Sequence, residues 1–140
     1  MSMELYIEAT GESDLPVVCL HGWGMNLRVF DQIREAVEPV GVETWAMDLP
    51  GHGRSPWDPA RAEFALQLQD VMSNLPPRCV LLGWSLGGQI ALEIARVAPQ
   101  RDQAADRQRA GFGNRSLGGV IVARGHRQRY RIRRRHLRGA

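Results

Sequence analysis

One serine in this sequence has a glycine two positions away on either side, in the segment Gly83-Trp84-Ser85-Leu86-Gly87. A serine hydroxyl attacks an ester carbonyl when a tight turn lifts it clear of the backbone and a base accepts its proton. Glycines at 83 and 87 suit such a turn, because side chains there would collide with neighbouring backbone. The pattern predicts that Ser85 is a nucleophile, and a serine that only caps a helix is the alternative.

The oxyanion formed by such an attack needs backbone amides to stabilise it. The helix expected at 86–97 directs its N-terminal amides, including that of Leu86, towards Ser85. A second donor could come from HGWGMN at 21–26, which follows an apolar run and contains glycines that permit close approach. The amide of Trp23 is therefore the other predicted donor. A glycine turn with an incidental tryptophan is the alternative.

A third glycine-rich turn, DLPGHGRS at 48–55, also follows a strand-like segment. Open α/β sheets place their sites at the carboxyl ends of strands, so this turn is expected near the other two. We expect Asp48 to hydrogen-bond within its own turn and His52 to lie at the tip of the loop. A catalytic pair made of these two residues is the alternative.

Strands and helices must alternate to bring these three turns to one edge of a sheet. Continuous apolar runs at 16–22, 42–49 and 79–84 are typical of strands buried on both faces of a parallel sheet. A weakly alternating segment at 3–8 predicts an edge strand. The segments between these strands show helical spacing, so the sequence indicates βαβ units with a parallel sheet.

Three helices are predicted between and after these strands. The first covers 27–37, with one apolar face made of Val29, Phe30, Ile33 and Val37. The second starts at the cap Asp58, with Pro59 in its first position, and Pro76 ends it. The third is the helix at 86–97, which begins directly after Ser85.

Taken in order, the segments VVCLHGWGMN, AMDLPGHGRS and LLGWSLGGQIALEIA resemble the N-terminal half of an α/β-hydrolase. Among such enzymes the sequence is similar to the carboxylesterases that demethylate pimeloyl-[acyl-carrier protein] methyl ester in biotin synthesis, in which HGWG, DLPGHGRS and GWSLGG recur together. The resemblance covers 1–100. It implies an α/β fold, a partial α/β-hydrolase sheet that is truncated after the helix at 86–97.

The resemblance also implies a chemistry. Ser85 would form an acyl-enzyme with an ester carried on an acyl carrier protein and release methanol. The amides of Trp23 and Leu86 would hold the oxyanion, and Trp23 would also contact substrate. Gly83 and Gly87 are the motif glycines. The family needs neither a metal nor an organic cofactor.

The acid and the base of the family are missing from the expected places, because its chain order is Ser, then Asp or Glu, then His. The chain continues for only 55 residues beyond Ser85. Four residues there are candidates: Asp102, Asp106, His126 and His136. None follows a predicted strand, so we expect solvated residues and little or no turnover.

The composition changes abruptly at 101. Residues 1–100 hold six arginines and thirteen acidic residues, a net −7, whereas 101–140 hold twelve arginines and two acidic residues, a net +10. All eighteen basic residues are arginine. We interpret 101–140 as an Arg-rich tail that is either disordered or read out of frame. The alternative function is an inert hydrolase-like fragment whose basic tail binds nucleic acid or another acidic partner.

Composition and patterning give the remaining expectations. The chain of 140 residues is 44% apolar and 24% charged, values of a globular protein, with no apolar run long enough to span a bilayer and no signal peptide. We therefore expect a cytoplasmic monomer. Cys19 and Cys79 lie in apolar runs, which predicts buried free thiols. Without further strands, 79–84 would be a bare hydrophobic edge, which predicts poor solubility.

Overall fold

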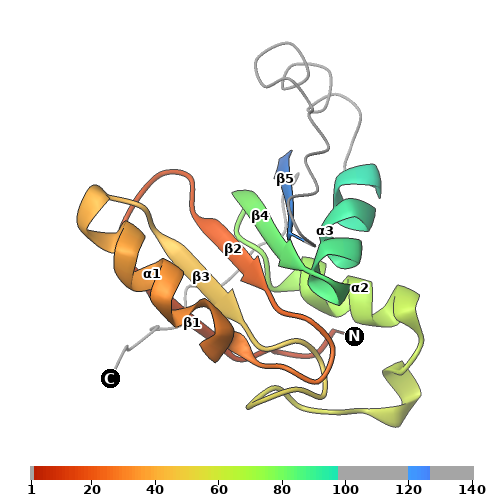
Figure 1. Ribbon diagram of the computed structural model, residues 1–140. Helices are drawn as coiled ribbons and strands as arrows, with labels where there is room; N and C mark the ends of the chain where they lie inside the picture. The colour runs from red at the N-terminus through yellow and green to blue at the C-terminus, as the bar shows by residue number, and fades with distance from the viewer. Residues whose placement is uncertain (1, 98–119, 127–140) are drawn as a thin grey trace.

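In the computed structural model, which describes residues 2–97 and 120–126, the chain forms a five-stranded sheet flanked by helices (Figure 1). The strands are β1 (Ile7–Thr10), β2 (Val17–Leu20), β3 (Thr44–Met47), β4 (Arg78–Trp84) and β5 (Val120–His126). The α-helices are α1 (Asp31–Val37), α2 (Phe64–Ser73) and α3 (Leu86–Val97), and the 3₁₀ turns are η1 (Leu27–Phe30), η2 (Glu38–Val40) and η3 (Pro59–Arg61).

The order of strands in the sheet is β1-β3-β2-β4-β5, and it creates the edge at which a site is expected. The three inner strands β3, β2 and β4 are parallel, while β1 and β5 pair antiparallel at the two sides. The chain leaves β2 for β3 on one side and then crosses to β4 on the other. The loops that follow β2 and β4 therefore flank the switch point of the sheet, where open α/β folds bind ligands.

Both faces of the inner strands are buried, as the apolar runs predict. On the face covered by α2 and α3, Val18 and Leu20 of β2 pack with Met47 of β3 and Leu81 of β4. Cys19 points to the other face, where it packs with residues of η1. Cys19 and Cys79 are both buried, and neither forms a disulfide, as predicted. The sheet is thus a rigid base for the turns at its carboxyl edge.

In the first helical segment, the side chains that point to the core are not all those that the sequence predicted. Val29 and Ile33, expected on the inner face, are 49% and 46% exposed, whereas Phe30 and Arg34 point inward. The reason is that 27–30 forms a 3₁₀ turn with about three residues per turn, which shifts the inward positions relative to an α-helix. The Arg34 guanidinium donates to the Thr44 hydroxyl at 3.3 Å and so ties α1 to β3.

The second predicted helix is divided, and the third is as predicted. The Asp58 carboxylate accepts the Ala60 N–H at 2.9 Å and Pro59 starts η3, but η3 ends at Arg61 and α2 begins only at Phe64. Arg61 turns back to form an ion pair with the fully buried Asp70 at 2.9 Å. The predicted helix at 86–97 coincides with α3.

The prediction of a bare edge at β4 is wrong. β5 pairs with β4 along its whole length, from Arg78 opposite His126 to Trp84 opposite Val120. The first four residues of β5 are the apolar run VIVA at 120–123. An open edge at β4 is therefore no longer a reason to expect poor solubility. Residues 98–119 and 127–140 lie outside the described part of the chain. Among the helices of the described residues, none is long and apolar enough to cross a membrane.

Candidate active site

Ser85 is the single residue between the end of β4 and the start of α3. Its φ is 51°, and it is the only non-glycine residue with positive φ among those that the structure describes. Such a conformation costs a serine roughly 1–3 kcal/mol, and strain of this kind gathers at functional sites. The side chain is exposed to solvent. The sharp turn inferred from the residue pattern is therefore present, with the hydroxyl outside the sheet.

The motif glycines are required by close backbone packing. A Cβ atom at Gly83 would overlap the carbonyl group of Gly87. One at Gly87 would overlap the carbonyl oxygen of Leu20 and lie 2.7 Å from that of His21. The first turn of α3 thus packs directly on the end of β2, and no other residue type fits at either position.

The loop that carries Trp23 lies against the serine. A Cβ atom placed on the preceding residue, Gly22, would be only 3.5 Å from the Ser85 Cβ and 3.1 Å from the Trp84 ring. Trp23 itself is 80% exposed. The structure therefore brings the loop that carries Trp23 against the Ser85 turn at the switch point of the sheet, although the two segments are far apart in the chain.

The amide of Leu86, the other predicted donor, lies at the N-terminus of α3. Leu86 is the first residue of this helix, and the Gln89 N–H donates to the Ser85 carbonyl at 3.0 Å to close the first helical turn. The first amides of a helix have no acceptor within the helix and carry a partial positive charge. An anion formed beside Ser85 would meet this end of the helix.

Asp48 and His52 do not form a catalytic pair. The buried Asp48 carboxylate accepts the Leu27 N–H at 2.8 Å and the Arg54 N–H at 2.9 Å, so it organises its own turn as predicted. His52 bonds instead to backbone, at the Gly24 N–H and the Pro50 carbonyl. Both side chains therefore hold loops in place.

His21 is the residue of this region that the sequence analysis missed. It is fully buried, and its Nε2 accepts the Leu49 N–H at 3.0 Å. Burial, aided by the neighbouring His52, lowers its pKa below the ordinary value, against the opposing effects of the Gly22 carbonyl and Asp48. The available signal was that each of the two turns carries a His-Gly pair, at His21 and at His52.

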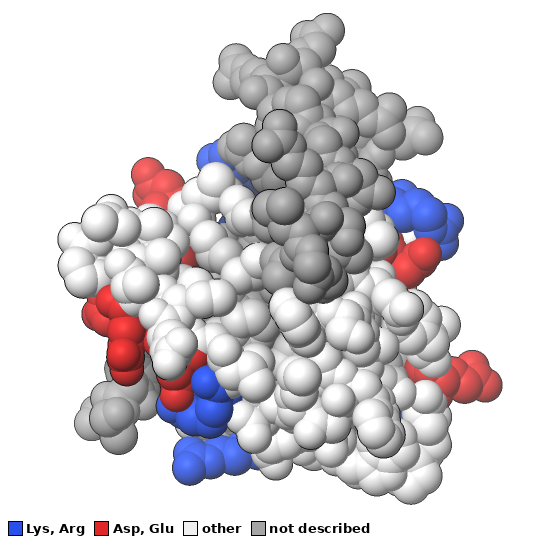
Figure 2. Space-filling view, in the orientation of Figure 1, with Lys and Arg blue, Asp and Glu red and all other residues white. Residues whose placement is uncertain are grey.

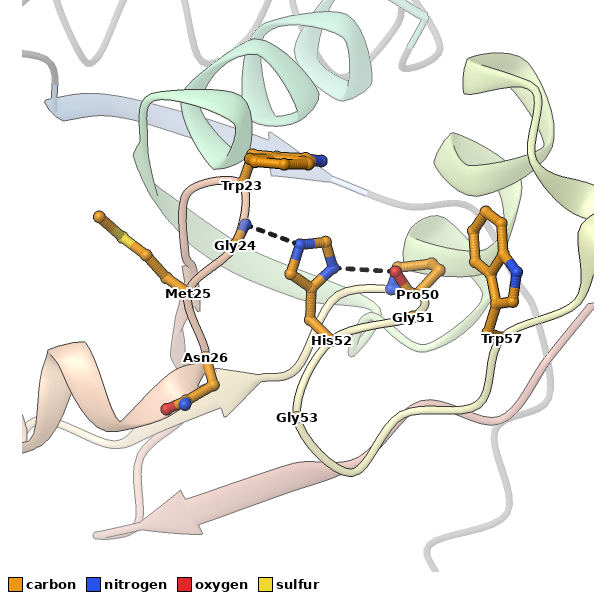
Figure 3. Close-up of a pocket in the computed structure, with 9 residues that line it drawn as sticks. All are labelled: Trp23, Gly24, Met25, Asn26, Pro50, Gly51, His52, Gly53 and Trp57. Carbon is orange, nitrogen blue, oxygen red and sulfur yellow. Dashed lines mark hydrogen bonds between the residues drawn. The ribbon is translucent and has the colours of Figure 1, made fainter.

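An open hollow of about 610 Å³ lies between the loop after β2 and the turn after β3 (Figure 3). Its lining comprises Trp23, Gly24, Met25, Asn26, Pro50, Gly51, His52, Gly53 and Trp57. None of these residues is an acid, an arginine or a lysine. On the face drawn in Figure 2, the charged side chains lie mainly towards the margins. Two exposed tryptophans, Trp23 and Trp57, therefore border a depression that has no acidic, arginine or lysine side chain in its lining.

The candidates for the acid and the base fall in two groups. Asp102, Asp106 and His136 lie outside the described residues. His126 ends β5, so the expectation that no strand precedes it is wrong, but its register partner is Arg78, at the opposite end of β4 from Ser85. Six residues of strand span about 20 Å, which places the backbone of His126 too far away to serve as the base.

Within the described residues, no His, Asp or Glu side chain hydrogen-bonds to the Ser85 hydroxyl. The same residues contain no group of three or more His, Cys, Asp or Glu side chains that could hold a metal ion. The arrangement at the sheet edge offers a strained serine, a helix N-terminus and a glycine loop. These parts can bind an oxyanion, and they need a base from elsewhere.

Comparison with known proteins gives a consistent result. A sequence model described as the alpha/beta hydrolase family matches residues 17–139. Pimeloyl-[acyl-carrier protein] methyl ester esterase of Klebsiella pneumoniae (strain 342) is 40% identical over 101 residues, and that of Vibrio campbellii 41% over 102. These matches cover 72% of this chain but only 38% and 39% of the two relatives.

Solved structures show the same fold. An esterase from Exiguobacterium antarcticum superposes with a TM-score of 0.60 and 28% identity, over 68% of this chain and 37% of its own. A hydrolase from Pseudomonas aeruginosa superposes with a TM-score of 0.60 and 29% identity, over 69% and 38%. In each comparison the chain spans less than half of the matched protein.

Proposed function

The chain belongs to the alpha/beta hydrolase family, and from this membership we propose that Ser85 is the nucleophile of a serine carboxylester hydrolase. The observation that carries the proposal is the positive φ of Ser85, 51°, at a strand-to-helix turn with its side chain exposed. The substrate proposed is pimeloyl-[acyl-carrier protein] methyl ester, because relatives about 40% identical bear the name of that esterase. Since the chain spans 38% of such a relative, activity, substrate and carrier protein are all parts of the proposal.

The proposed reaction passes through an acyl-enzyme. The Ser85 oxygen attacks the ester carbon while its proton moves to a base, and the carbonyl oxygen becomes an oxyanion that accepts hydrogen bonds from the Trp23 and Leu86 amides. Collapse of this intermediate breaks the bond to the methoxy group, which takes up a proton and leaves as methanol. Water then attacks the acyl-enzyme, releases the free carboxylate and restores Ser85.

The proposed reaction needs a base beside Ser85. A serine hydroxyl stays protonated at neutral pH, and without a positioned base it is a weak nucleophile. The described residues include the proposed nucleophile and the two proposed amides, but His126 lies at the opposite end of β4 from Ser85. We therefore expect little or no turnover from this chain, and the test must detect a single covalent event.

The test is covalent labelling of the full chain by a fluorophosphonate probe, read by intact mass and by peptide mapping. We expect slow labelling confined to Ser85 and abolished in the Ser85→Ala variant. Ser13→Ala is the matched control, because Ser13 is exposed and precedes β2 at the opposite edge of the sheet. Equal labelling of Ser13 and Ser85, or none at all, would remove the proposal of an activated serine in this chain.

A second candidate function rests on charge. The net +10 of residues 101–140 favours a catalytically inert fragment that binds an acidic partner such as nucleic acid. A gel shift with RNA and DNA at low salt tests it. Binding that weakens steeply with salt would favour this function, and the absence of any shift at low salt would remove it.

A further inference from the structure

Two histidines join the loop after β2 to the turn after β3, and each accepts a hydrogen bond from the other segment. His21 accepts the Leu49 N–H at 3.0 Å, and His52 accepts the Gly24 N–H at 2.9 Å, in both cases through Nε2. Their ring centroids are 5.0 Å apart. Figure 3 shows His52 between Gly24 on one side and Pro50 on the other. The two segments are thus bonded reciprocally.

The bonding pattern fixes the tautomer of both rings. Each Nδ1 lies beside a carbonyl oxygen, that of Gly22 at 2.7 Å for His21 and that of Pro50 at 3.0 Å for His52. Carbonyl oxygens only accept and amides only donate, so Nδ1 carries the hydrogen and Nε2 presents its lone pair. Each ring therefore donates through Nδ1 and accepts through Nε2, and for His21 the lowered pKa agrees with a neutral ring.

The hydrogen bond between Gly24 and His52 lies next to Trp23, whose amide is proposed to bind the oxyanion. Gly22 lies against Ser85, Trp23 follows it, and Gly24 comes next. A Cβ atom at Gly24 would meet nothing within 4 Å, so side-chain packing does not hold this point of the loop. Its neighbours are held by hydrogen bonds, with the Met25 N–H donating to the Gly22 carbonyl at 3.2 Å. His52 is the side chain that fixes Gly24 itself.

We propose that His52 is a positioning residue, which holds the amide of Trp23 opposite Ser85 by accepting the N–H of Gly24. The assignment of an oxyanion role to that amide rests on the proposed function, whereas the anchoring of the loop does not. The charged or titratable groups that surround His52 are His21, from the loop after β2, and, on its own turn, Asp48 and Arg54. Arg54 is directed away, because its guanidinium lies 5.2 Å from the ring centroid of Tyr6.

The experiment uses the full chain, uniformly ¹⁵N-labelled, with the matched variants His52→Gln and His52→Met. The two replacements have similar length, but only glutamine presents an acceptor near the position of Nε2. We expect the Gly24 amide to exchange with solvent about fivefold to tenfold faster in the methionine variant, the loss expected for one neutral hydrogen bond. The glutamine variant should restore most of the protection.

Two internal controls keep the test decisive. The Leu27 amide, which donates to Asp48, should exchange at the same rate in all three proteins. The ¹⁵N shifts of the wild-type ring should show hydrogen on Nδ1 of His52, a measurement that needs no variant. Faster exchange at Leu27 as well, equal exchange at Gly24 in the two variants, or hydrogen on Nε2 would each overturn the proposal.

Fluorophosphonate labelling of the same three proteins separates this inference from the proposed function. If wild-type Ser85 is labelled, the rate should fall in the methionine variant and recover in the glutamine variant. An unchanged rate would overturn the positioning role. If wild-type Ser85 is not labelled although Gly24 responds as expected, the proposed function fails while the anchoring of the Trp23 loop by His52 stands.

Discussion

Two neighbouring turns at the carboxyl edge of the sheet are held by different forces. The turn at Ser85 is fixed by steric packing, because Gly83 and Gly87 bring backbone against backbone. The loop that carries Trp23 is fixed by hydrogen bonds that its backbone donates to side chains further along the chain. The Leu27 N–H donates to Asp48, 21 residues on, and the Gly24 N–H donates to His52, 28 residues on. The proposed nucleophile is therefore placed by the residue types of its own segment, whereas its proposed amide partner is placed by another segment.

The largest effect should come from disturbing the packed turn. Gly87→Ala places a methyl group in the space of the Leu20 carbonyl, and because both partners are backbone neither can move aside. We expect a loss of about 3–5 kcal/mol in the free energy of unfolding, or no folded protein, measured by urea denaturation. Gly24→Ala is the control, since nothing lies within 4 Å of a Cβ there and only backbone strain is added. Equal losses in the two variants would contradict the packing argument.

Loss of the Asp48 carboxylate should destabilise the loop that carries Trp23 and lower the free energy of unfolding. Asp48→Ala leaves the amides of Leu27 and Arg54 without their acceptors, at a cost of about 2–4 kcal/mol in unfolding free energy. Asp48→Asn keeps one acceptor oxygen and should lose about half as much. The exposed Asp14→Ala serves as control in the same urea titrations. An Asn variant as unstable as the Ala variant would show that charge, and not hydrogen bonding, is what Asp48 contributes.

This contrast explains how far the sequence could be read. Glycine positions, apolar runs and the helix at 86–97 are local signals, and they predicted the alternation of strands and helices and the Ser85 turn. The contact between His52 and Gly24 joins residues 28 positions apart, and no local pattern encodes it. The pairing of β5 with β4 was missed for the same reason, because an apolar run shows that a strand is possible and not which edge it joins.

A smaller effect tests whether the turn at Ser85 stores backbone strain. Glycine tolerates the φ of 51° at position 85, whereas alanine pays for the left-handed conformation as serine does. Ser85→Gly should therefore be more stable than Ser85→Ala by about 1 kcal/mol, with both variants unable to react with a fluorophosphonate. Because neither variant has a hydroxyl at position 85, their difference in stability reports only the backbone conformation. If alanine proves the more stable, the turn is unstrained.

The smallest effect is the contribution of His21 to stability, which changes only when the pH is lowered. The pKa of His21 is lowered from 6.5, first because burial disfavours the charged ring. As the pH falls below the ordinary value the unfolded chain takes up a proton that the folded chain resists, so this contribution to stability is complete above pH 6.5 and is lost below it.

His21→Gln isolates that contribution, since glutamine can accept the Leu49 N–H but does not titrate. The unfolding free energy of the wild type should fall between pH 7.5 and 5.5 with a slope below about 1.4 kcal/mol per pH unit, the limit for one proton, and the variant should fall less steeply. This range stays above 4.5, the ordinary pKa of Glu8, whose pKa is also lowered. If the unfolding free energies of the two proteins fall with the same slope, the pKa of His21 is not lowered in the folded protein. Protonation would then break the hydrogen bond from Leu49 without destabilising the fold.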